Sequence, residues 1–378
     1  MAGIYIHIPF CKQACYYCNF HFSTQLDNRD QMVAAICKDI QLRHNYLEER
    51  KLDSLYFGGG TPSILSIGQL AQIMDALKSY FVIGHDAEIT LECNPDDIDS
   101  SYLQGLQHLG INRLSLGVQS FFDADLEFMH RAHDANHALK SLDLIREAGF
   151  QNVTLDLIYA APTTTDEMWI QNLQRVIEAG VPHISAYCLT IEENTVFGRW
   201  HKHQKMSAID EEKASTQFYM MVDMLSQAGY EQYEISNFAK PGYEAVHNGN
   251  YWKGKPYLGI GPAAHSYNGK ERSWNVANNA KYIRAMVNDE LAVETEVLSA
   301  VDQCNEMIMT RLRTSWGLDM KMLEEKFGDM LAQEVYSSLR DPWIADHVDI
   351  EAGVVKLNRK GKIMADRIAA NLFVTSQL

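Results

Sequence analysis

Positive charge is scarce in this 378-residue sequence, in which 33 Lys and Arg stand against 49 Asp and Glu for a formal net charge of −16. This charge balance argues against a nucleic-acid partner, but it is compatible with a peripheral membrane contact. No stretch reaches the roughly 18 uninterrupted apolar residues that a transmembrane helix needs. The N-terminus lacks a basic segment, and His7 and Pro9 interrupt its apolar residues. This pattern does not predict a signal peptide. We therefore expect a cytoplasmic protein.

The sequence also has no low-complexity linker and only 9 Pro. Its residues are 46% hydrophobic and 22% charged, which is enough apolar material for a full core. This composition excludes global disorder and collagen-like structure. The length predicts two or three domains.

A disulfide framework is not expected, because the seven cysteines are odd in number and the chain is long. Three of them, Cys11, Cys15 and Cys18, fall within eight residues. The other four lie in apolar stretches and are best explained as small buried hydrophobic residues; they are Cys37, Cys93, Cys188 and Cys304. Only the clustered thiols therefore call for a functional explanation.

Three clustered thiols are compatible with two kinds of metal centre. A structural zinc site needs four ligands, and His7 or His21 could complete one. A [4Fe–4S] cluster bound by three thiolates would instead leave one iron with an open coordination position. The spacing of Cys11, Cys15 and Cys18 resembles the cluster loop of the radical S-adenosylmethionine (SAM) superfamily. In that superfamily the amino and carboxylate groups of SAM occupy the open iron.

Short β-branched or aromatic runs alternate with helical patterns through the first half of the chain. The expected strands cover 4–7, 55–57, 88–92, 113–118, 153–158 and 184–189. Such alternation predicts βαβ units and a parallel sheet. Six units are too few for a closed eight-fold barrel, so a partial barrel and a doubly wound sheet both fit.

The tail has a different pattern. Helices are expected at 301–315, after Asp319 and at 333–339, followed by a hairpin over 347–357 and a further helix to about Leu372. Helices followed by a two-stranded wing are typical of a winged-helix-like module. Because the tail has no basic face, we expect an accessory domain that packs on or covers a site.

Polar and glycine residues follow the expected strands, where α/β enzymes place their sites. The run Gly58-Gly59-Gly60 has no side chains to pack, which favours close approach of a ligand to the backbone. Carboxylates at strand ends can accept hydrogen bonds from ribose hydroxyls or an ammonium group, and Arg131 can bind a carboxylate. Together these residues predict a polar ring around one opening.

Several motifs resemble the oxygen-independent coproporphyrinogen oxidase group of radical SAM proteins. They are Ile6 to Cys11, Gly58 to Pro62, Glu92 to Pro95, Gly117 to Phe121 and Asp156 to Tyr159. The resemblance implies that Cys11, Cys15 and Cys18 ligate a [4Fe–4S] cluster. It places SAM contacts at Tyr5, Gly59, Gly60, Thr61, Glu92, Gln119, Arg131 and Asp156. It also implies an α/β fold: a partial (β/α)₆ TIM-type barrel over 1–240, a connecting segment over 241–300 and a C-terminal helical, winged-helix-like domain over 301–378.

Two features shift the resemblance toward the related family of haem chaperones. Phe20 stands where the oxidases carry one more cysteine, and the run from His247 to Trp252 is similar to the chaperones' His-Asn-x-x-Tyr-Trp signature. His247, Tyr251 and Trp252 would then contact haem from a loop, with His7, His21 and His265 as further candidate iron ligands. The alternative is a loop whose aromatic residues only fill a gap between barrel and tail.

Three functional hypotheses follow. The first is a chaperone that carries a [4Fe–4S] cluster and SAM and delivers haem to an acceptor protein. The second is oxidative decarboxylation of coproporphyrinogen III by a 5′-deoxyadenosyl radical. The third is a zinc-binding winged-helix regulator.

Overall fold

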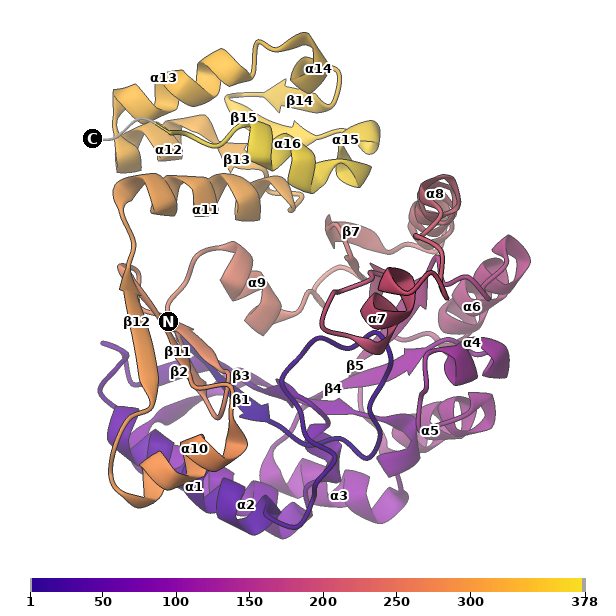
Figure 1. The fold of residues 1–378 in the computed structure, drawn as a ribbon, viewed down its shortest axis with the longest axis vertical. Coiled ribbons are helices and arrows are strands. Elements are labelled where there is room, and N and C mark those ends of the chain that lie inside the picture. Colours follow the sequence, from indigo (N-terminus) through magenta and orange to yellow (C-terminus); the bar gives the residue numbers. More distant parts are fainter. Residues whose placement is uncertain (1, 376–378) are drawn as a thin grey trace.

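The computed structural model describes residues 2–375, which form a curved sheet with helices along its outer side and a C-terminal lobe above it (Figure 1). The first six strands are β1 (Ala2–Ile8), β2 (Lys51–Gly59), β3 (Val82–Cys93), β4 (Arg113–Gln119), β5 (Asn152–Tyr159) and β6 (His183–Cys188). They lie side by side in chain order and are all parallel. The predicted six-unit partial barrel is therefore confirmed.

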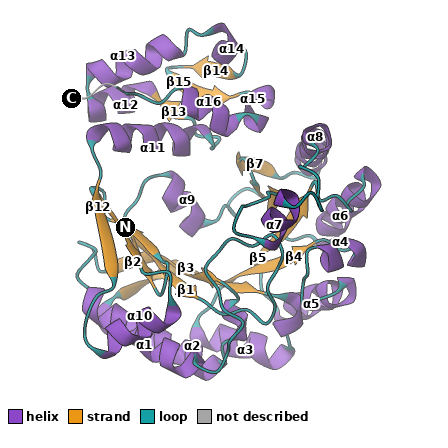
Figure 2. Ribbon diagram, in the orientation of Figure 1, coloured by secondary structure: helices purple, strands orange, loops and turns teal. Residues whose placement is uncertain are grey.

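The elements that connect these strands are mostly helices on the outer side of the sheet (Figure 2). They are α1 (Arg29–Arg43), η1 (Pro62–Ile64), α2 (Ile67–Tyr80), η2 (Pro95–Asp97), α3 (Ser100–Leu109), α4 (Asp123–Phe128), α5 (Ala135–Ala148) and α6 (Asp166–Ala179). Gly110, Gly149 and Gly180 end α3, α5 and α6 in the left-handed conformation. Glycine adopts this conformation without steric cost, so each of these three helices can end in a tight turn.

The sheet continues beyond both edges of the barrel. The added elements are α7 (Val196–Lys202), α8 (Glu211–Gln227), β7 (Glu231–Glu234), β8 (Asn237–Ala239), α9 (Val246–Trp252), β9 (Tyr257–Ile260), β10 (His265–Tyr267), β11 (Glu271–Asn275), α10 (Asn279–Val287) and β12 (Val293–Val297). β8 pairs with β6, and β9 pairs in parallel with β1. The segment 241–300, expected to connect two domains, thus contributes β9 to β12 to a 12-stranded sheet.

The run from His247 to Trp252 is helical, so the predicted loop is wrong. The Glu88 carboxylate accepts hydrogen bonds from the backbone N–H groups of Val246 and His247, both at 2.9 Å. A carboxylate at a helix N-terminus satisfies unpaired N–H groups and interacts favourably with the helix dipole. Glu88 lies on β3, so no local sequence pattern reveals this cap.

The C-terminal lobe has its own hydrophobic core, separate from the barrel core. It contains α11 (Ala300–Leu312), β13 (Leu318–Asp319), α12 (Met320–Phe327), α13 (Asp329–Ser338), α14 (Pro342–Ala345), β14 (Val348–Glu351), β15 (Val354–Leu357), α15 (Arg359–Ile363) and α16 (Ala365–Asn371). The predicted hairpin is β14 and β15. Arg313 joins the lobe to the barrel through an ion pair with Glu234 at 3.1 Å. Within residues 2–375, no helix combines the length and apolar character needed to cross a bilayer.

Candidate functional site

The carboxyl ends of β1 to β6 open into a cavity of about 700 Å³, here called the cysteine cavity. All three clustered cysteines line it, together with seven of the eight predicted SAM contacts: Gly59, Gly60, Thr61, Glu92, Gln119, Arg131 and Asp156. The remaining predicted contact, Tyr5, stacks on Tyr56 with ring centroids 6.1 Å apart and lines a different cavity. The strand ends therefore bring the three cysteines and all but one of the predicted SAM-contacting residues into one cavity.

The loop that carries the cysteines is held in place by the backbone. Ser23 accepts from the N–H of Cys11 at 3.1 Å and donates its own N–H to the carbonyl of Pro9 at 2.9 Å. On the other side, the Tyr16 ring stacks on His130 at 4.3 Å. The thiols are thus positioned by the protein itself, as a cofactor loop requires.

The thiols have the chemistry of a cluster site. Burial raises the pKa of Cys11 to about 12 and that of Cys18 to about 11, so a metal must displace protons on binding. Across residues 2–375, no three His, Cys, Asp or Glu side chains converge as a single metal ion would require. A [4Fe–4S] cluster differs, because each thiolate binds its own iron and the sulfurs need not meet at one point. The donor set therefore fits a cluster better than a single ion.

The zinc hypothesis loses its fourth ligand. His7 and His21 do not line the cysteine cavity but a separate cavity, which is described below. The His7 Nε2 atom lies 2.8 Å from the carbonyl oxygen of His21, and His21 Nε2 lies 2.7 Å from the Asn279 amide oxygen. Both imidazoles therefore lie outside the cavity that holds the three thiols.

Arg131 braces the cysteine loop. Its guanidinium donates to the Cys15 sulfur at 3.4 Å and to the Tyr17 hydroxyl at 3.2 Å. A second branch donates to the Asn94 side-chain oxygen at 2.7 Å and to the Gly117 carbonyl at 2.9 Å. Its Nε–H is buried without a partner in the described chain, so this donor alone remains for a ligand. The expected carboxylate clamp is in the structure mainly a loop support.

The carboxyl groups of two residues, Glu92 on β3 and Asp156 on β5, face the cysteine cavity with strand β4 between them. Burial raises the pKa of Glu92 to about 7, and the negative charge of Asp156 adds to the shift. Burial likewise raises the pKa of Asp156 to about 6, opposed by hydrogen bonds from Ser115 and Ser185. Arg113 and Arg131 act on Asp156 through their charge, but within residues 2–375 neither carboxyl group forms an ion pair, so a positively charged ligand would stabilise both ionised forms.

The glycine run borders the cavity, but packing within the chain also demands it. A Cβ at Gly59 would lie 2.6 Å from the His7 ring, and Gly59 has a φ of +112°. A Cβ at Gly60 would lie 2.6 Å from the carbonyl oxygen of Phe10. Packing alone therefore requires glycine at these two positions, because the segment at and after β1 lies directly against them. The prediction that only ligand contact explains the glycine run is wrong.

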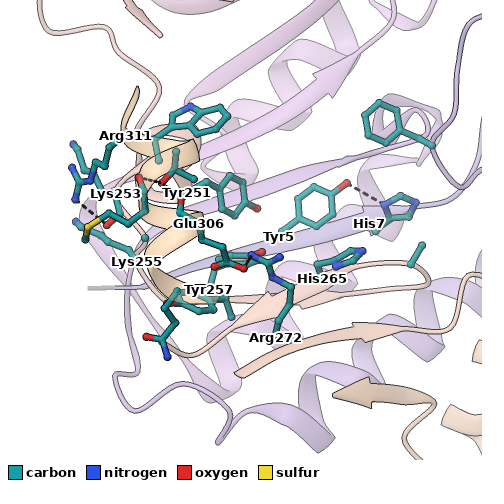
Figure 3. A pocket seen from close by; sticks show the side chains of 18 of the residues that line it. Tyr5, His7, Tyr251, Lys253, Lys255, Tyr257, His265, Arg272, Glu306 and Arg311 are labelled. Atoms are coloured by element: carbon teal, nitrogen blue, oxygen red, sulfur yellow. Dashed lines mark hydrogen bonds and ion pairs between the residues drawn. The ribbon is translucent and has the colours of Figure 1, made fainter. Parts of the chain in front are cut away.

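A second cavity of about 640 Å³, here called the interlobe cavity, is lined by residues of β1, of β9 to β11 and of α11, and Figure 3 shows their side chains. Tyr251 and Trp252 line it, as do Tyr5, His7, His21 and His265. Asn19 and Phe20 border both cavities, and the Phe20 side chain is 71% exposed. The residue that replaces the oxidase cysteine thus stands where the two cavities adjoin.

His247 lines neither cavity. It is 2% exposed, with its Nδ1 atom 2.9 Å from the Ser54 hydroxyl and its Nε2 atom 2.8 Å from the Tyr251 hydroxyl. Burial lowers its pKa to about 3, so the imidazole is neutral near pH 7. A neutral imidazole has one donor and one acceptor nitrogen, and both are engaged here. His247 therefore orients Tyr251.

Sequence reasoning missed some of the residues that border the cavities. Asn94, Ser115 and Tyr187 lie in the cysteine cavity. The strand-end rule could have included Asn94 and Tyr187, which lie at or beside the ends of β3 and β6, but not Ser115, which lies within β4. Lys253, Tyr257, Arg272 and Arg311 line the interlobe cavity. No spacing rule finds these four residues, because they meet only through the pairing of β9 with β1 and the packing of α11.

Comparisons with known proteins agree with this architecture. Residues 5–189 match the Radical SAM superfamily model, and residues 298–341 match the HemN C-terminal domain model. The chain is 34% identical over 323 residues to heme chaperone HemW of Lactococcus lactis, covering 85% of this chain and 84% of that protein. It is 31% identical to heme chaperone HemW of Bacillus subtilis, covering 97% of this chain and 98% of that one.

Among solved structures, the chain resembles coproporphyrinogen III oxidase (HemN) from Escherichia coli, a radical SAM enzyme. The TM-score is 0.83 at 25% sequence identity, and the match covers 99% of this chain and 90% of the oxidase chain. The oxidase fold thus extends over both the barrel and the C-terminal lobe.

Proposed function

Because this chain belongs to the radical SAM family of the heme chaperone HemW, we propose that it binds haem and delivers it to an acceptor protein in the cytoplasm. Haem chaperoning demands two properties of a protein. The ligand must be held firmly enough to be kept from solution, and it must lie close enough to the surface to be released. A cavity between two lobes satisfies both demands.

In this proposal Cys11, Cys15 and Cys18 hold a [4Fe–4S] cluster that offers SAM one open iron position. Gly59, Gly60 and Thr61 border the cysteine cavity beside the thiols, and Gln119 and Asp156 line it from β4 and β5. The buried carboxyl groups of Glu92 and Asp156 would neutralise positive charge on SAM. Tyr5 would act through its stacking on Tyr56, and Arg131 through the loop it braces.

The observation that carries the haem proposal is the interlobe cavity. Its volume of about 640 Å³ lies in the range of small-molecule and cofactor sites. Tyr251 and Trp252 supply aromatic surface in its wall, and the Trp252 indole N–H is buried without a partner in the described chain. Aromatic faces suit a porphyrin ring, and an unpaired donor suits a ligand that carries acceptor oxygens.

The experiment is a titration of the purified chain with hemin, followed by gel filtration and measurement of the Soret band in the protein fraction. We expect stoichiometric haem retention, reduced by Trp252→Ala, which removes aromatic wall, and by His247→Ala, which releases Tyr251. Lys140→Gln, an exposed change on α5, serves as the matched control. Wild-type retention in both cavity variants would count against this site.

The oxidase is the second candidate, because its fold covers the whole chain. Phe20 argues against it, since the oxidases carry a cysteine at that place beside the cluster. Anaerobic incubation with coproporphyrinogen III, SAM and a reductant separates the two functions. We expect no decarboxylated product, and robust product formation would favour the oxidase.

A further inference from the structure

The interlobe cavity has two chemically different ends. In Figure 3 the side chains of Lys253, Lys255 and Arg311 gather at one end, and His7 and His265 lie at the other. These residues come from distant parts of the chain: the segment after α9, helix α11, β1 and β10. The arrangement defines an axis along which a ligand of matching polarity would lie.

The basic end has an excess of positive charge. Within residues 2–375, neither Lys253 nor Arg311 forms an ion pair with a carboxylate. Burial, together with the nearby charges of Lys255 and Arg311, lowers the pKa of Lys253, and burial lowers the pKa of Arg311. Neighbouring cations repel one another, and an anion placed between them would remove this repulsion. This end of the cavity therefore calls for an anionic ligand group.

At the other end, three histidines line the cavity but differ in what their rings contact. His7 lies 3.1 Å from the Tyr5 hydroxyl through Nδ1 and 2.8 Å from the His21 carbonyl oxygen through Nε2. His21 is bonded to Asn279. His265 is exposed at the start of β10, and its only ring neighbour in the described chain is Trp274, 5.9 Å away. Of the three, His265 alone has both ring nitrogens unengaged.

We propose that His265 supplies the axial imidazole ligand to the haem iron and that Lys253 and Arg311 bind the haem propionates. Haem matches both ends of the cavity, because its iron lies at the centre of a flat apolar ring and both of its carboxylates leave from one edge. The Tyr5 and Tyr257 side chains border the space between the two ends. This assignment rests on the proposed haem function and differs from a site centred on His247.

The first test is hemin titration of wild type, His265→Ala and His108→Ala, the last an exposed histidine on α3 outside the cavity. We expect His265→Ala to raise the hemin Kd on the order of tenfold and to shift the Soret maximum. Imidazole added to the buffer should restore both in His265→Ala, because it can occupy the vacated ligand position. His108→Ala should behave as wild type. An unchanged Soret band in His265→Ala, or a loss that imidazole does not restore, would overturn the ligand assignment.

The second test compares hemin with its dimethyl ester, which lacks free carboxylates. Lys253→Gln and Arg311→Gln should each weaken hemin binding roughly tenfold through loss of a charge-assisted hydrogen bond. The ester should bind wild type more weakly than hemin does, and neither substitution should weaken it further. Lys140→Gln is the control for a lost surface charge. Equal effects of the two substitutions on hemin and ester would refute the propionate contacts.

Failure of this assignment is distinguishable from failure of the haem function itself. A wild-type chain that retains no hemin after gel filtration would remove the function. A wild-type chain that retains hemin, with His265→Ala, Lys253→Gln and Arg311→Gln all unchanged, would leave the function and place the haem elsewhere.

Discussion

The cysteine cavity and the interlobe cavity are assembled from different kinds of chain segment. The cysteine cavity is bordered mainly by the loop after β1 and by the ends of the parallel strands that follow, so position in the sequence maps directly onto position in the wall. The interlobe cavity combines β1 with α9, β9 to β11 and α11. Its wall forms only when the N-terminal strand β1 packs with segments from the last third of the chain.

The two cavities also differ in the balance of their charges, although each also holds the other sign: Arg113 and Arg131 line the cysteine cavity, and Glu306 lines the interlobe cavity. Glu92 and Asp156 place buried carboxyl groups in the cysteine cavity, whereas Lys253, Lys255 and Arg311 place cations in the interlobe cavity. SAM carries a sulfonium and an ammonium group beside a single carboxylate, whereas haem carries two carboxylates. Each cavity therefore suits one ligand and disfavours the other, although they share the side chains of Asn19 and Phe20. The predictions below test this separation.

The largest effect is expected from the thiols. Replacing Cys11, Cys15 or Cys18 with Ala should abolish the iron–sulfur charge-transfer absorbance, because each thiolate binds its own iron. Cys37→Ala, on α1 outside both cavities, should leave the absorbance unchanged. Hemin affinity of Cys15→Ala should change by no more than roughly twofold if the cavities act independently. A stable four-iron cluster in Cys15→Ala would disprove the ligand set.

The next effect is expected at the carboxyl groups. Asp156→Asn removes the charge but keeps the shape, so SAM affinity should fall roughly ten- to hundredfold with cluster content intact. Isothermal titration with SAM measures the affinity, and iron and sulfide analysis measures the cluster. Gln119 needs a different substitution, because its φ of 65° would strain alanine. Gln119→Asn tolerates this backbone and should also weaken SAM binding. Unchanged affinity in both variants would refute the site.

His247→Ala should act mainly on the wall of the interlobe cavity, although the His247 ring also stacks on Tyr56 of the cysteine cavity. Loss of the imidazole leaves the Ser54 and Tyr251 hydroxyls unpaired, which should lower the free energy of unfolding by about 1–3 kcal/mol. Tyr251→Phe removes one hydrogen bond and should cost less. Urea denaturation measures both. A reduced SAM affinity in His247→Ala would show instead that the two cavities are coupled.

The smallest effect is expected from pH. With pKa values of about 7 for Glu92 and about 6 for Asp156, both groups are mostly protonated at pH 5.5 and mostly ionised at pH 8. Only the ionised forms attract the positive charges of SAM, so affinity should rise severalfold from pH 5.5 to 8. Asp156→Asn should flatten this dependence. A profile that is flat in wild type would separate these carboxyl groups from SAM binding.

The sequence predicts the barrel well because its signals are local. Strands β1 to β6 appear where the apolar runs indicate. The helical state of α9 escapes prediction, because its cap, Glu88, lies on β3. Tyr5 and His247 were assigned by motif, but their final positions depend on neighbours brought together by the sheet. Local patterns thus identify the cysteine cavity, and long-range pairing builds the interlobe cavity.

Strands β1 and β9 pair in parallel but lie far apart in the chain, so the ribosome synthesises them at different times. The ribosome makes β1 first, and at roughly 5–20 residues per second β9 emerges only some 13–50 s later. Until then one edge of β1 is open, with the apolar side chains of Ile4, Ile6 and Ile8 next to it. An open apolar strand edge invites pairing with other chains. A fragment that ends at residue 240 therefore lacks the strand that protects β1, and the nascent chain needs this edge shielded until translation passes residue 260.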